Sequence, residues 1–530
     1  MTGERIYLYD STLRDGAQTQ GVDFSAGDKA AIAHELDRLG IDYVEGGWPG
    51  ANPTDDAFFA TPPKLGRSRL AAFGMTRRAG RSADNDPGLQ AVLGAKADVV
   101  TLVGKTWDFH VEVALGVSLD ENLKMISESL AHAAKRSKET MFDAEHFFDG
   151  WRANPKYAMD CLKAARDAGA KWVILCDTNG GTLPHDIERI VGEVAKTIPG
   201  SMLGIHCHND TGNAIANSLA AVRAGARQIQ GSLNGLGERC GNADLIAIIP
   251  NLMLKMGYTT GMSAADLKHL TQVSHALDER LNRAPDRSAP YVGESAFAHK
   301  GGMHVSAVAK DPKSYEHIAP EAVGNRRHII VSDQAGRSNL LAQLQAAGIE
   351  IAAGDPKLAR LVEEVKQREF IGYSYDGAEA SFELLARRAL GGVPEFFKLL
   401  SFRVLDERRW NAKGELITLS EATIKAVIDG NTVMAVAEGN GPVSALDAAL
   451  RKVLTPRYPS LAELHLVDYK VRILDPQSGT GATTRVIIES ADQKNARWST
   501  VGVSTNVIDA SYNALHDSIT YLLLRDGAKA

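Results

Sequence analysis

Short apolar runs alternate with segments of helical spacing along the first half of the chain. Each run is rich in β-branched and other apolar residues, as buried parallel strands are, and a polar loop and an amphipathic segment follow it. Eight such runs occur, at 5–10, 41–47, 69–75, 97–104, 140–146, 171–177, 202–208 and 227–233. Eight evenly spaced units predict an α/β fold, a (β/α)8 TIM barrel. A doubly wound open sheet is the competing fold, but no GxGxxG loop follows the first run.

The helical segments carry their own start and stop signals. In the first of them Ser25 is placed as an N-cap, Asp28 follows three residues later as in a capping box, and Gly40 stands where a helix would end. We therefore expect a helix between Ser25 and Gly40, on the outside of the barrel.

The pattern changes after the eighth unit. The chain is loop-rich to about residue 330, and helical spacing returns from about 335 to 395. Further on, ATIKAVIDGNTVMAVAEG indicates two strands joined at an Asp-Gly turn, and strands followed by a helix then occur twice. We predict a barrel at 1–265, a linker with helical subdomains at 266–395, and an internally duplicated α+β domain at 396–530.

Length, charge and cysteine content limit the class of protein. A chain of 530 residues is too long for one hydrophobic core, and a net charge of −6 argues against a nucleic-acid surface. No stretch is long and apolar enough to cross a membrane, and a strand pattern begins at once without a signal segment. The four cysteines, Cys161, Cys176, Cys207 and Cys240, are scattered along the chain, as buried thiols in a reducing compartment are. We therefore expect a cytoplasmic protein without a disulfide framework.

Polar residues gather at the carboxyl ends of the eight predicted strands, where TIM barrels carry their active sites. Taken singly, each has an ordinary explanation, such as a turn former, a loop hydroxyl or a helix cap. As a set they predict one site at the barrel mouth, and they are Arg14, Asp15, Glu145, Thr178, His206, His208 and Asn242.

The stretch GIHCHND, residues 204–210, indicates a metal site. Successive side chains of a strand alternate between faces, so His206 and His208 point the same way while Cys207 faces the opposite layer. Together with Asp15, and with Asn242 as a possible fourth partner, the two imidazoles form a mixed nitrogen and oxygen set. Such a set suits a divalent ion, Zn²⁺, Mn²⁺ or Mg²⁺, with positions left open for a substrate.

Two further residues suggest the reaction type. Arg14 would place a cation where negative charge develops on a substrate oxygen; the alternative is a structural ion pair with a loop carboxylate. Glu145 would serve as a base if it is partly desolvated. The residues by themselves therefore predict enolisation, or the making or breaking of a carbon–carbon bond, beside a metal-bound 2-oxo acid.

Seven stretches resemble the 2-isopropylmalate synthase and homocitrate synthase superfamily of metal-dependent barrels. They are STLRDGAQ, EGGWPGANP, DAEHFFDG, CDTNGGTLP, IHCHNDTGNAIANSLAAVRAGA, NGLGERCGNADL and AFAHKGGMHVSAV. Within it, EGGWPGANPTDDAFF, DAEHFFDGW and SYEHIAPEAVGNRRHIIVSDQAGRSNL are similar to the citramalate synthase branch. The resemblance implies an acyltransferase that condenses acetyl-CoA with a 2-oxo acid, in this branch pyruvate, to give (R)-citramalate for isoleucine biosynthesis.

The resemblance also implies roles for individual residues. Arg14 would bind the substrate and stabilise its alkoxide, Thr178 would hold the 2-oxo acid carboxylate, and Glu145, helped by His304, would deprotonate the acetyl methyl group. Tyr315 falls where the family has a tyrosine near the acetyl group; from the residues alone His304 and Tyr315 are ordinary linker residues. The implied metal ligands are Asp15, His206 and His208, with Asn242 in or near the shell.

The shape of the pocket discriminates only weakly between pyruvate and larger 2-oxo acids. Some pyruvate-using relatives have an aromatic residue before the catalytic glutamate, which helps to close a small pocket, whereas Ala144 stands at that place here. Trp48, Phe147 or Phe148 would supply bulk instead, unless they are core aromatics. A methylene group changes discrimination by only about 1–3 kcal/mol, so pyruvate is an expectation that depends on the resemblance.

The resemblance further implies a homodimer whose linker crosses to the partner, and a C-terminal domain that binds an amino acid, in this branch isoleucine, as an inhibitor. Polar loops lead into the two helices of that domain, which would suit a small carboxylate. Ordinary caps in a domain that only dimerises are the competing interpretation.

Three other functions stay open. A metal-dependent lyase would use similar barrel elements, but cleaving relatives generally lack the long C-terminal domain. A sister synthase acting on 2-oxoisovalerate (2-isopropylmalate synthase) or 2-oxoglutarate would differ only in pocket shape. An amino-acid sensor with an inactive barrel would show gaps in the set of site residues, and no gap is seen.

Overall fold

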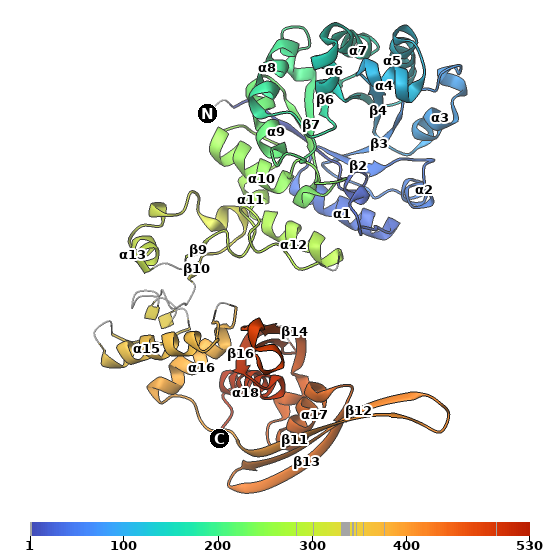
Figure 1. Ribbon diagram of the computed structural model, residues 1–530. Helices are drawn as coiled ribbons and strands as arrows, with labels where there is room; N and C mark the ends of the chain where they lie inside the picture. The colour runs from blue at the N-terminus through green and yellow to red at the C-terminus, as the bar shows by residue number, and fades with distance from the viewer. Residues whose placement is uncertain are drawn as a thin grey trace. The chain divides into compact units, whose positions relative to one another are not determined.

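The computed structural model describes residues 3–281, 283–299, 302–329, 340–341, 344–345, 347–352, 355–375, 377–493 and 496–529. The chain divides into two compact units (Figure 1). The first comprises residues 1–297 and 317–327, and the second residues 298–316 and 328–530. No helix among the described residues is both long and apolar enough to cross a membrane.

The first unit contains a closed barrel of eight parallel strands, which confirms the predicted fold. The strands follow one another around the barrel, and β1 closes it by pairing with β8, with Leu8 opposite Ile229. Their bounds are β1 Tyr7–Asp10, β2 Tyr43–Gly47, β3 Arg69–Met75, β4 Val99–Lys105, β5 Glu139–Glu145, β6 Trp172–Asp177, β7 Leu203–Cys207 and β8 Gln228–Gly231.

Helices follow the strands in sequence and cover the outside of the barrel (Figure 1). The main ones are α1 Ala26–Leu39, α2 Pro53–Ala60, α3 Pro87–Gly94, α5 Leu119–Ala134, α7 Pro155–Asp167, α8 Pro184–Ala195, α9 Ala214–Arg223 and α10 Leu245–Pro250. Two short helices, α4 Asp108–His110 and α6 Phe147–Ala153, lie in the loops after β4 and β5.

Helix α1 has the ends that its sequence predicts. Ser25 Oγ accepts a hydrogen bond from the backbone N–H of Asp28 at 3.1 Å, and the Asp28 carboxylate accepts one from the N–H of Ser25 at 3.0 Å. Gly40 ends the helix with a φ of 88°, a left-handed conformation that glycine adopts without the steric cost of a Cβ atom.

Alternation along the strands separates two layers of side chains. One face of each strand packs against the helices in a large apolar core, which includes Leu8, Val44 and Leu175. The other face fills the barrel interior, where Tyr9, Met141 and Trp172 form a smaller apolar cluster. Buried polar residues share this interior and lead up to the mouth, among them Glu45, Thr101, Asp143, Gln228 and Gln230.

The segment after the barrel is more helical than its sequence suggests. Besides the short α11 Ala264–Leu267, a full helix, α12 Leu270–Arg280, lies in the part expected to be loop-rich. Its buried residues Leu270, Val273 and Leu277 recur at helical spacing, but many polar residues between them hide the pattern.

The second unit begins with short elements and continues with helices. They are β9 Ala298–His299, α13 Gly302–Lys310, β10 His328–Ile329, α15 Pro356–Phe370 and α16 Glu379–Leu390. The expected return of helical spacing is therefore found, although its start at about residue 335 lies outside the described residues.

The C-terminal part repeats three antiparallel strands and a helix, which confirms the internal duplication. Asp429 and Gly430 join β12 and β13 with φ values of 49° and 75°, as a two-residue hairpin turn requires. A first strand, β11, precedes the two runs that the sequence pattern singled out. The elements are β11 Lys398–Trp410, β12 Leu416–Ile428, β13 Asn431–Gly439, α17 Pro442–Leu454, β14 His465–Ile473, β15 Thr484–Ala491, β16 Arg497–Ser504 and α18 Val507–Arg525.

Candidate active site

One carboxylate and two imidazoles meet at the mouth of the barrel. Asp15, His206 and His208 each offer a ligand atom, and these atoms lie within 4.8 Å of one another. His206 Nε2 is 3.3 Å from Asp15 Oδ2, and the two imidazole rings have centroids 5.1 Å apart. All three residues are buried. The alternation of β7 and the loop after β1 thus bring together residues almost 200 positions apart along the chain.

The surroundings set the charges of these groups. Burial alone would raise the pKa of Asp15, but Arg14 and His206 outweigh it and hold that pKa well below its usual value. Burial and the neighbouring His206 lower the pKa of His208 to about 3. An anionic carboxylate and a neutral imidazole are the forms that bind a metal ion. Burial opposes protonation of His206 as well, yet contact with Asp15 leaves its pKa raised.

Asn242, expected as a possible fourth ligand, pairs with the residue that carries one of the imidazoles, although it is not among the residues that line the pocket. An antiparallel backbone bridge places Asn242 opposite His208. Both polar atoms of its side chain are buried without a hydrogen-bond partner among the described residues, and so is His208 Nδ1. A Cβ atom at Gly237 would lie 2.8 Å from Asn242 Cγ, so only glycine leaves room for the amide there. Buried polar atoms without partners, next to a carboxylate and imidazoles, fit a bound divalent cation.

Arg14 is held firmly beside this cluster. Its Nε donates to Glu45 Oε2 at 2.7 Å, its guanidinium carbon lies 3.9 Å from the centre of the Phe73 ring, and Nη2 is 3.5 Å from Asp15 Oδ2. The other oxygen of the fully buried Glu45 accepts from the Tyr9 hydroxyl at 2.8 Å. The Nε edge of the guanidinium is therefore bonded to Glu45, and Arg14 also lines the pocket.

Glu145 ends β5 and Thr178 directly follows the neighbouring strand β6. The Glu145 carboxylate lies 2.5 Å from Lys105 Nζ, and its side chain is about a quarter exposed, at 24%. Thr178 Oγ1 accepts a hydrogen bond of 2.8 Å from the backbone N–H of His146, a residue in the left-handed conformation with φ of 56°. Because the Thr178 oxygen acts there as an acceptor, its own O–H remains available to donate to a ligand.

One pocket of about 270 Å³ lies at the barrel mouth. The polar side chains that line it include Arg14, Asp15, Lys105, Glu145, Thr178, His206 and His208. Trp48, Phe73, Met75 and Val103 form its apolar wall, with the Trp48 and Phe73 rings edge to face at 5.4 Å. Alternate residues of β5 face inward, so Asp143 lines the pocket beside Glu145, whereas Ala144, the residue that precedes Glu145, does not. Ala144 is fully buried in the outer core.

The three aromatic residues expected to fill the pocket also divide between the pocket and the core. Trp48 lines the pocket, as one of the three aromatic candidates was expected to do. Phe147 and Phe148 are fully buried in the core between strands and helices, so they are core aromatics.

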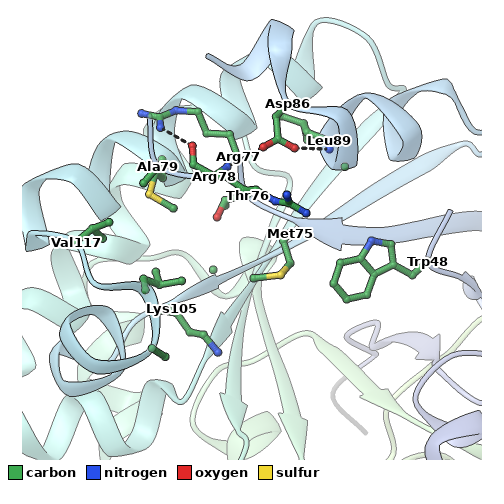
Figure 2. Close-up of a pocket in the computed structure, with 15 residues that line it drawn as sticks. Trp48, Met75, Thr76, Arg77, Arg78, Ala79, Asp86, Leu89, Lys105 and Val117 are labelled. Atoms are coloured by element: carbon green, nitrogen blue, oxygen red, sulfur yellow. Dashed lines mark hydrogen bonds between the residues drawn. The ribbon is translucent and has the colours of Figure 1, made fainter. Parts of the chain in front are cut away.

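A second hollow of about 270 Å³ lies between the loops after β3 and β4 (Figure 2). Its walls are largely apolar, with Leu89, Leu115 and Val117 among them. The backbone after β3 brings Arg77 and Arg78 to it, and Arg77 is paired with Glu121 and Glu128. Trp48, Met75 and Lys105 line both this hollow and the pocket with the histidines, so the two share a wall.

His304 and Tyr315 lie in the second unit. Their rings stack on each other with centroids 4.1 Å apart, and both side chains are exposed. The structure thus places these two residues together, and their action at the barrel mouth stays a prediction.

Sequence reasoning missed several residues that contact the site. Lys105 ends β4 as Glu145 ends β5, so the rule that selected Glu145 would have found it. Glu45 lies within β2, and its contact with Arg14, 31 positions away along the chain, is not readable from spacing. Asp143 and Gln230 face inward from the middle of strands, where the carboxyl-end rule does not apply.

Three family profiles match successive parts of the chain. One described as HMGL-like matches residues 5–276, one described as homocitrate synthase post-HMGL domain-like matches residues 291–370, and the LeuA allosteric (dimerisation) domain matches residues 376–523. The first alone covers about half of the chain.

Relatives match over nearly the whole length. The (R)-citramalate synthase of Aquifex aeolicus is 51% identical over 99% of this chain and 98% of its own. The (R)-citramalate synthase of Geobacter sulfurreducens is 51% identical over 98% of this chain and 97% of its own. A probable 2-isopropylmalate synthase of Methanopyrus kandleri is 31% identical over 98% and 99%. The barrel, the C-terminal repeat and these full-length matches place the chain in the (R)-citramalate synthase family of HMGL-like proteins.

Proposed function

We propose that the chain is an acyltransferase that condenses acetyl-CoA with pyruvate, releasing CoA and forming (R)-citramalate. One observation carries the proposal: the Asp15, His206 and His208 cluster shares a small pocket with an arginine, a carboxylate and a free hydroxyl donor. Those are the groups needed to hold a 2-oxo acid, remove a proton from an acetyl group and stabilise the oxygen that becomes negative.

Asp15, His206, His208 and Asn242 would hold a divalent ion, Zn²⁺, Mn²⁺ or Mg²⁺. When bound, the ion supplies Lewis-acid chemistry toward the 2-oxo acid. The protein provides the rest. Thr178 O–H donates to the substrate carboxylate, and the apolar wall of Trp48, Phe73 and Met75 meets the methyl group.

Glu145 takes a proton from the methyl group of acetyl-CoA, and the resulting carbon nucleophile forms a bond to the carbonyl carbon of pyruvate. The carbonyl oxygen becomes an alkoxide, beside which Arg14 is already oriented by Glu45 and Phe73. Such a preformed cation needs no reorganisation when the charge develops. The alkoxide then takes up a proton to become a hydroxyl group. A water molecule adds to the thioester carbonyl and the carbon–sulfur bond breaks, which releases CoA as its thiol and leaves a carboxylate. His304 and Tyr315 are proposed, from the family resemblance, to assist at the acetyl group.

The hollow next to the pocket suits the long thiol arm of acetyl-CoA. It shares Met75 and Lys105 with the pocket, its walls are apolar, and the exposed Arg78 stands at its rim to meet phosphate groups (Figure 2). Arg78→Ala should raise the KM for acetyl-CoA several-fold and leave the KM for pyruvate unchanged. S-acetylpantetheine, which lacks the nucleotide phosphates, should show no difference between the variant and the unaltered protein.

Pyruvate is proposed over larger 2-oxo acids because the relatives named citramalate synthase are 51% identical, against 31% for the probable 2-isopropylmalate synthase. The aromatic and sulfur-containing wall of the pocket agrees with a short substrate. The alternative, 2-oxoisovalerate, needs room for a branched side chain at this wall.

We further propose that the protein is a cytoplasmic homodimer, since acetyl-CoA is a cytoplasmic co-substrate and residues 376–523 match a dimerisation domain. The same domain is described as allosteric, and from the resemblance we propose isoleucine as the inhibiting amino acid. On this proposal, residues 396–530 form the regulatory domain and residues 266–395 connect it to the catalytic barrel of residues 1–265.

The decisive experiment measures thiol release from acetyl-CoA with a panel of 2-oxo acids, each with and without the three branched-chain amino acids. Pyruvate should give the highest kcat/KM, and isoleucine should inhibit. A preference for 2-oxoisovalerate would overturn the substrate assignment, and no release with any 2-oxo acid would overturn the activity.

A further inference from the structure

His206 is connected to two buried polar residues that the proposed reaction does not use. Its Nδ1 lies 2.9 Å from Gln230 Oε1, and Gln230 Nε2 donates to Asp143 Oδ1 at 3.0 Å. The three side chains are 5%, 1% and 4% exposed, in the order His206, Gln230, Asp143. They form a short chain of hydrogen bonds inside the barrel, below the cluster of Asp15 and the two histidines.

The direction of each hydrogen bond follows from the chemistry of the groups. In the structure the Gln230 amide presents its N–H₂ to Asp143 Oδ1, which accepts as a carboxylate oxygen does. Its carbonyl oxygen is then left facing His206, and a carbonyl oxygen only accepts. His206 must therefore carry a hydrogen on Nδ1, and in the neutral ring this leaves the Nε2 lone pair free.

His206 Nε2 is the atom that faces Asp15, at 3.3 Å. We propose that Gln230 and Asp143 are positioning residues for the metal site: together they hold His206 in the tautomer, and in the ring orientation, that presents Nε2 to a divalent cation. This inference rests on the proposed function of Asp15, His206 and His208 as metal ligands. Groups that orient a metal-binding histidine in this way typically change metal affinity 10–100-fold when they are removed.

The chain offers a matched control two residues away. Gln228 lies on the same strand and faces the same interior, and it is fully buried. Its neighbours are the Met141 sulfur, 3.7 Å from Nε2, and Gly204, and its own carbonyl oxygen has no hydrogen-bond partner among the described residues. Replacing Gln228 therefore tests burial of a glutamine in this barrel without a contact to His206.

The test compares Gln230→Leu with Gln228→Leu in the full-length protein. Metal-free samples are titrated with Zn²⁺ and with Mn²⁺, and thermal melting of the metal-free samples checks the fold. Gln230→Leu should weaken metal affinity 10–100-fold, whereas Gln228→Leu should stay within about twofold of the unaltered protein. Equal affinities in the two variants would overturn the inference.

A second pair of variants tests the role of Asp143. Asp143→Asn keeps an oxygen that can accept from Gln230, and it should bind metal about as well as the unaltered protein. Asp143→Leu frees the Gln230 amide to turn over, and its affinity should fall between those of the unaltered protein and Gln230→Leu. If Asp143→Leu binds as tightly as Asp143→Asn, Asp143 has no part in the arrangement.

A spectroscopic readout separates this role from a purely structural one. With ¹⁵N-labelled histidine, the His206 signals of the metal-free protein should show a hydrogen on Nδ1, and in Gln230→Leu they should shift toward a mixture of tautomers. An unchanged tautomer in Gln230→Leu would contradict the inference. Failure of the unaltered protein to bind either metal would instead contradict the proposed function, so the two failures can be told apart.

Discussion

The ammonium group of Lys105 lies 2.5 Å from the carboxylate of Glu145, at the ends of the neighbouring strands β4 and β5. The two residues are opposite each other in the register of the parallel pair, so the barrel itself sets their contact. Glu145 is therefore a carboxylate with a compensating cation on one side and the pocket on the other. This arrangement supports its proposed role as the base.

Glu145→Gln should lower kcat about 10²–10⁴-fold, because an amide cannot accept the proton of the acetyl methyl group. The metal content, measured by elemental analysis, should not change, since Glu145 lies outside the cluster of Asp15 and the histidines. Glu238→Gln removes another carboxylate that lines the pocket and serves as the control. Comparable losses in the two variants would argue against a specific role for Glu145.

His206→Ala and His208→Ala should each abolish turnover and metal binding while leaving the fold intact. Each removes one of three ligand atoms that lie within 4.8 Å of one another. Circular dichroism and metal analysis check the result, with His185→Ala on the outer helix α8 as the control, where the side chain is 74% exposed. A variant that keeps near-normal turnover and metal content would refute the ligand role.

Arg14→Lys should reduce kcat/KM about 10²–10³-fold although the charge is kept. The guanidinium contacts Glu45 through one edge and stacks on Phe73, and an ammonium group cannot do both and still reach a substrate oxygen. Steady-state kinetics with varied pyruvate measures the effect. Near-normal kinetics would show that charge alone suffices at this position.

Asp10 should make stability depend on pH. Burial is the largest influence on this carboxyl, opposed by hydrogen bonds from Thr12, and it raises the pKa of Asp10 to about 7 in the folded protein. The unfolded chain has the ordinary, lower value, so between about pH 4 and 7 the folded form binds more protons. The free energy of unfolding therefore falls as pH rises, by about 1.4 kcal/mol per unit for one such group, and levels off above pH 7.

Asp10→Asn removes this dependence while keeping an acceptor for Thr12. Its thermal midpoint relative to the unaltered protein should therefore rise from pH 5 to pH 7 and then stay constant. Melting curves at half-unit steps of pH provide the measurement. Asp186 is only partly buried, and its hydrogen bond with Arg189 lowers its pKa, so Asp186→Asn should give a flat difference over the same range. A flat difference for Asp10→Asn would contradict a raised pKa.

The barrel and much of the candidate site follow from local rules. Strand alternation makes His206 and His208 parallel neighbours, and parallel strands in a barrel bring their carboxyl ends, with Asp15, Glu145 and Thr178, to one mouth. The Asp429–Gly430 turn and the Ser25 capping box are local as well. These features depend on residue type and short spacing, and both can be read directly from the sequence.

The partners of the site residues were decided only by the tertiary structure. That Glu45 engages Arg14, that Lys105 pairs with Glu145, and that Gln230 contacts His206 depend on which strands lie side by side and in which register. That register results from packing of the whole barrel, over sequence separations that no spacing rule covers. The sequence by itself determined which chemical groups reach the mouth, whereas the folded barrel determined how each one is held, because contacts between distant strands exist only once the barrel has closed.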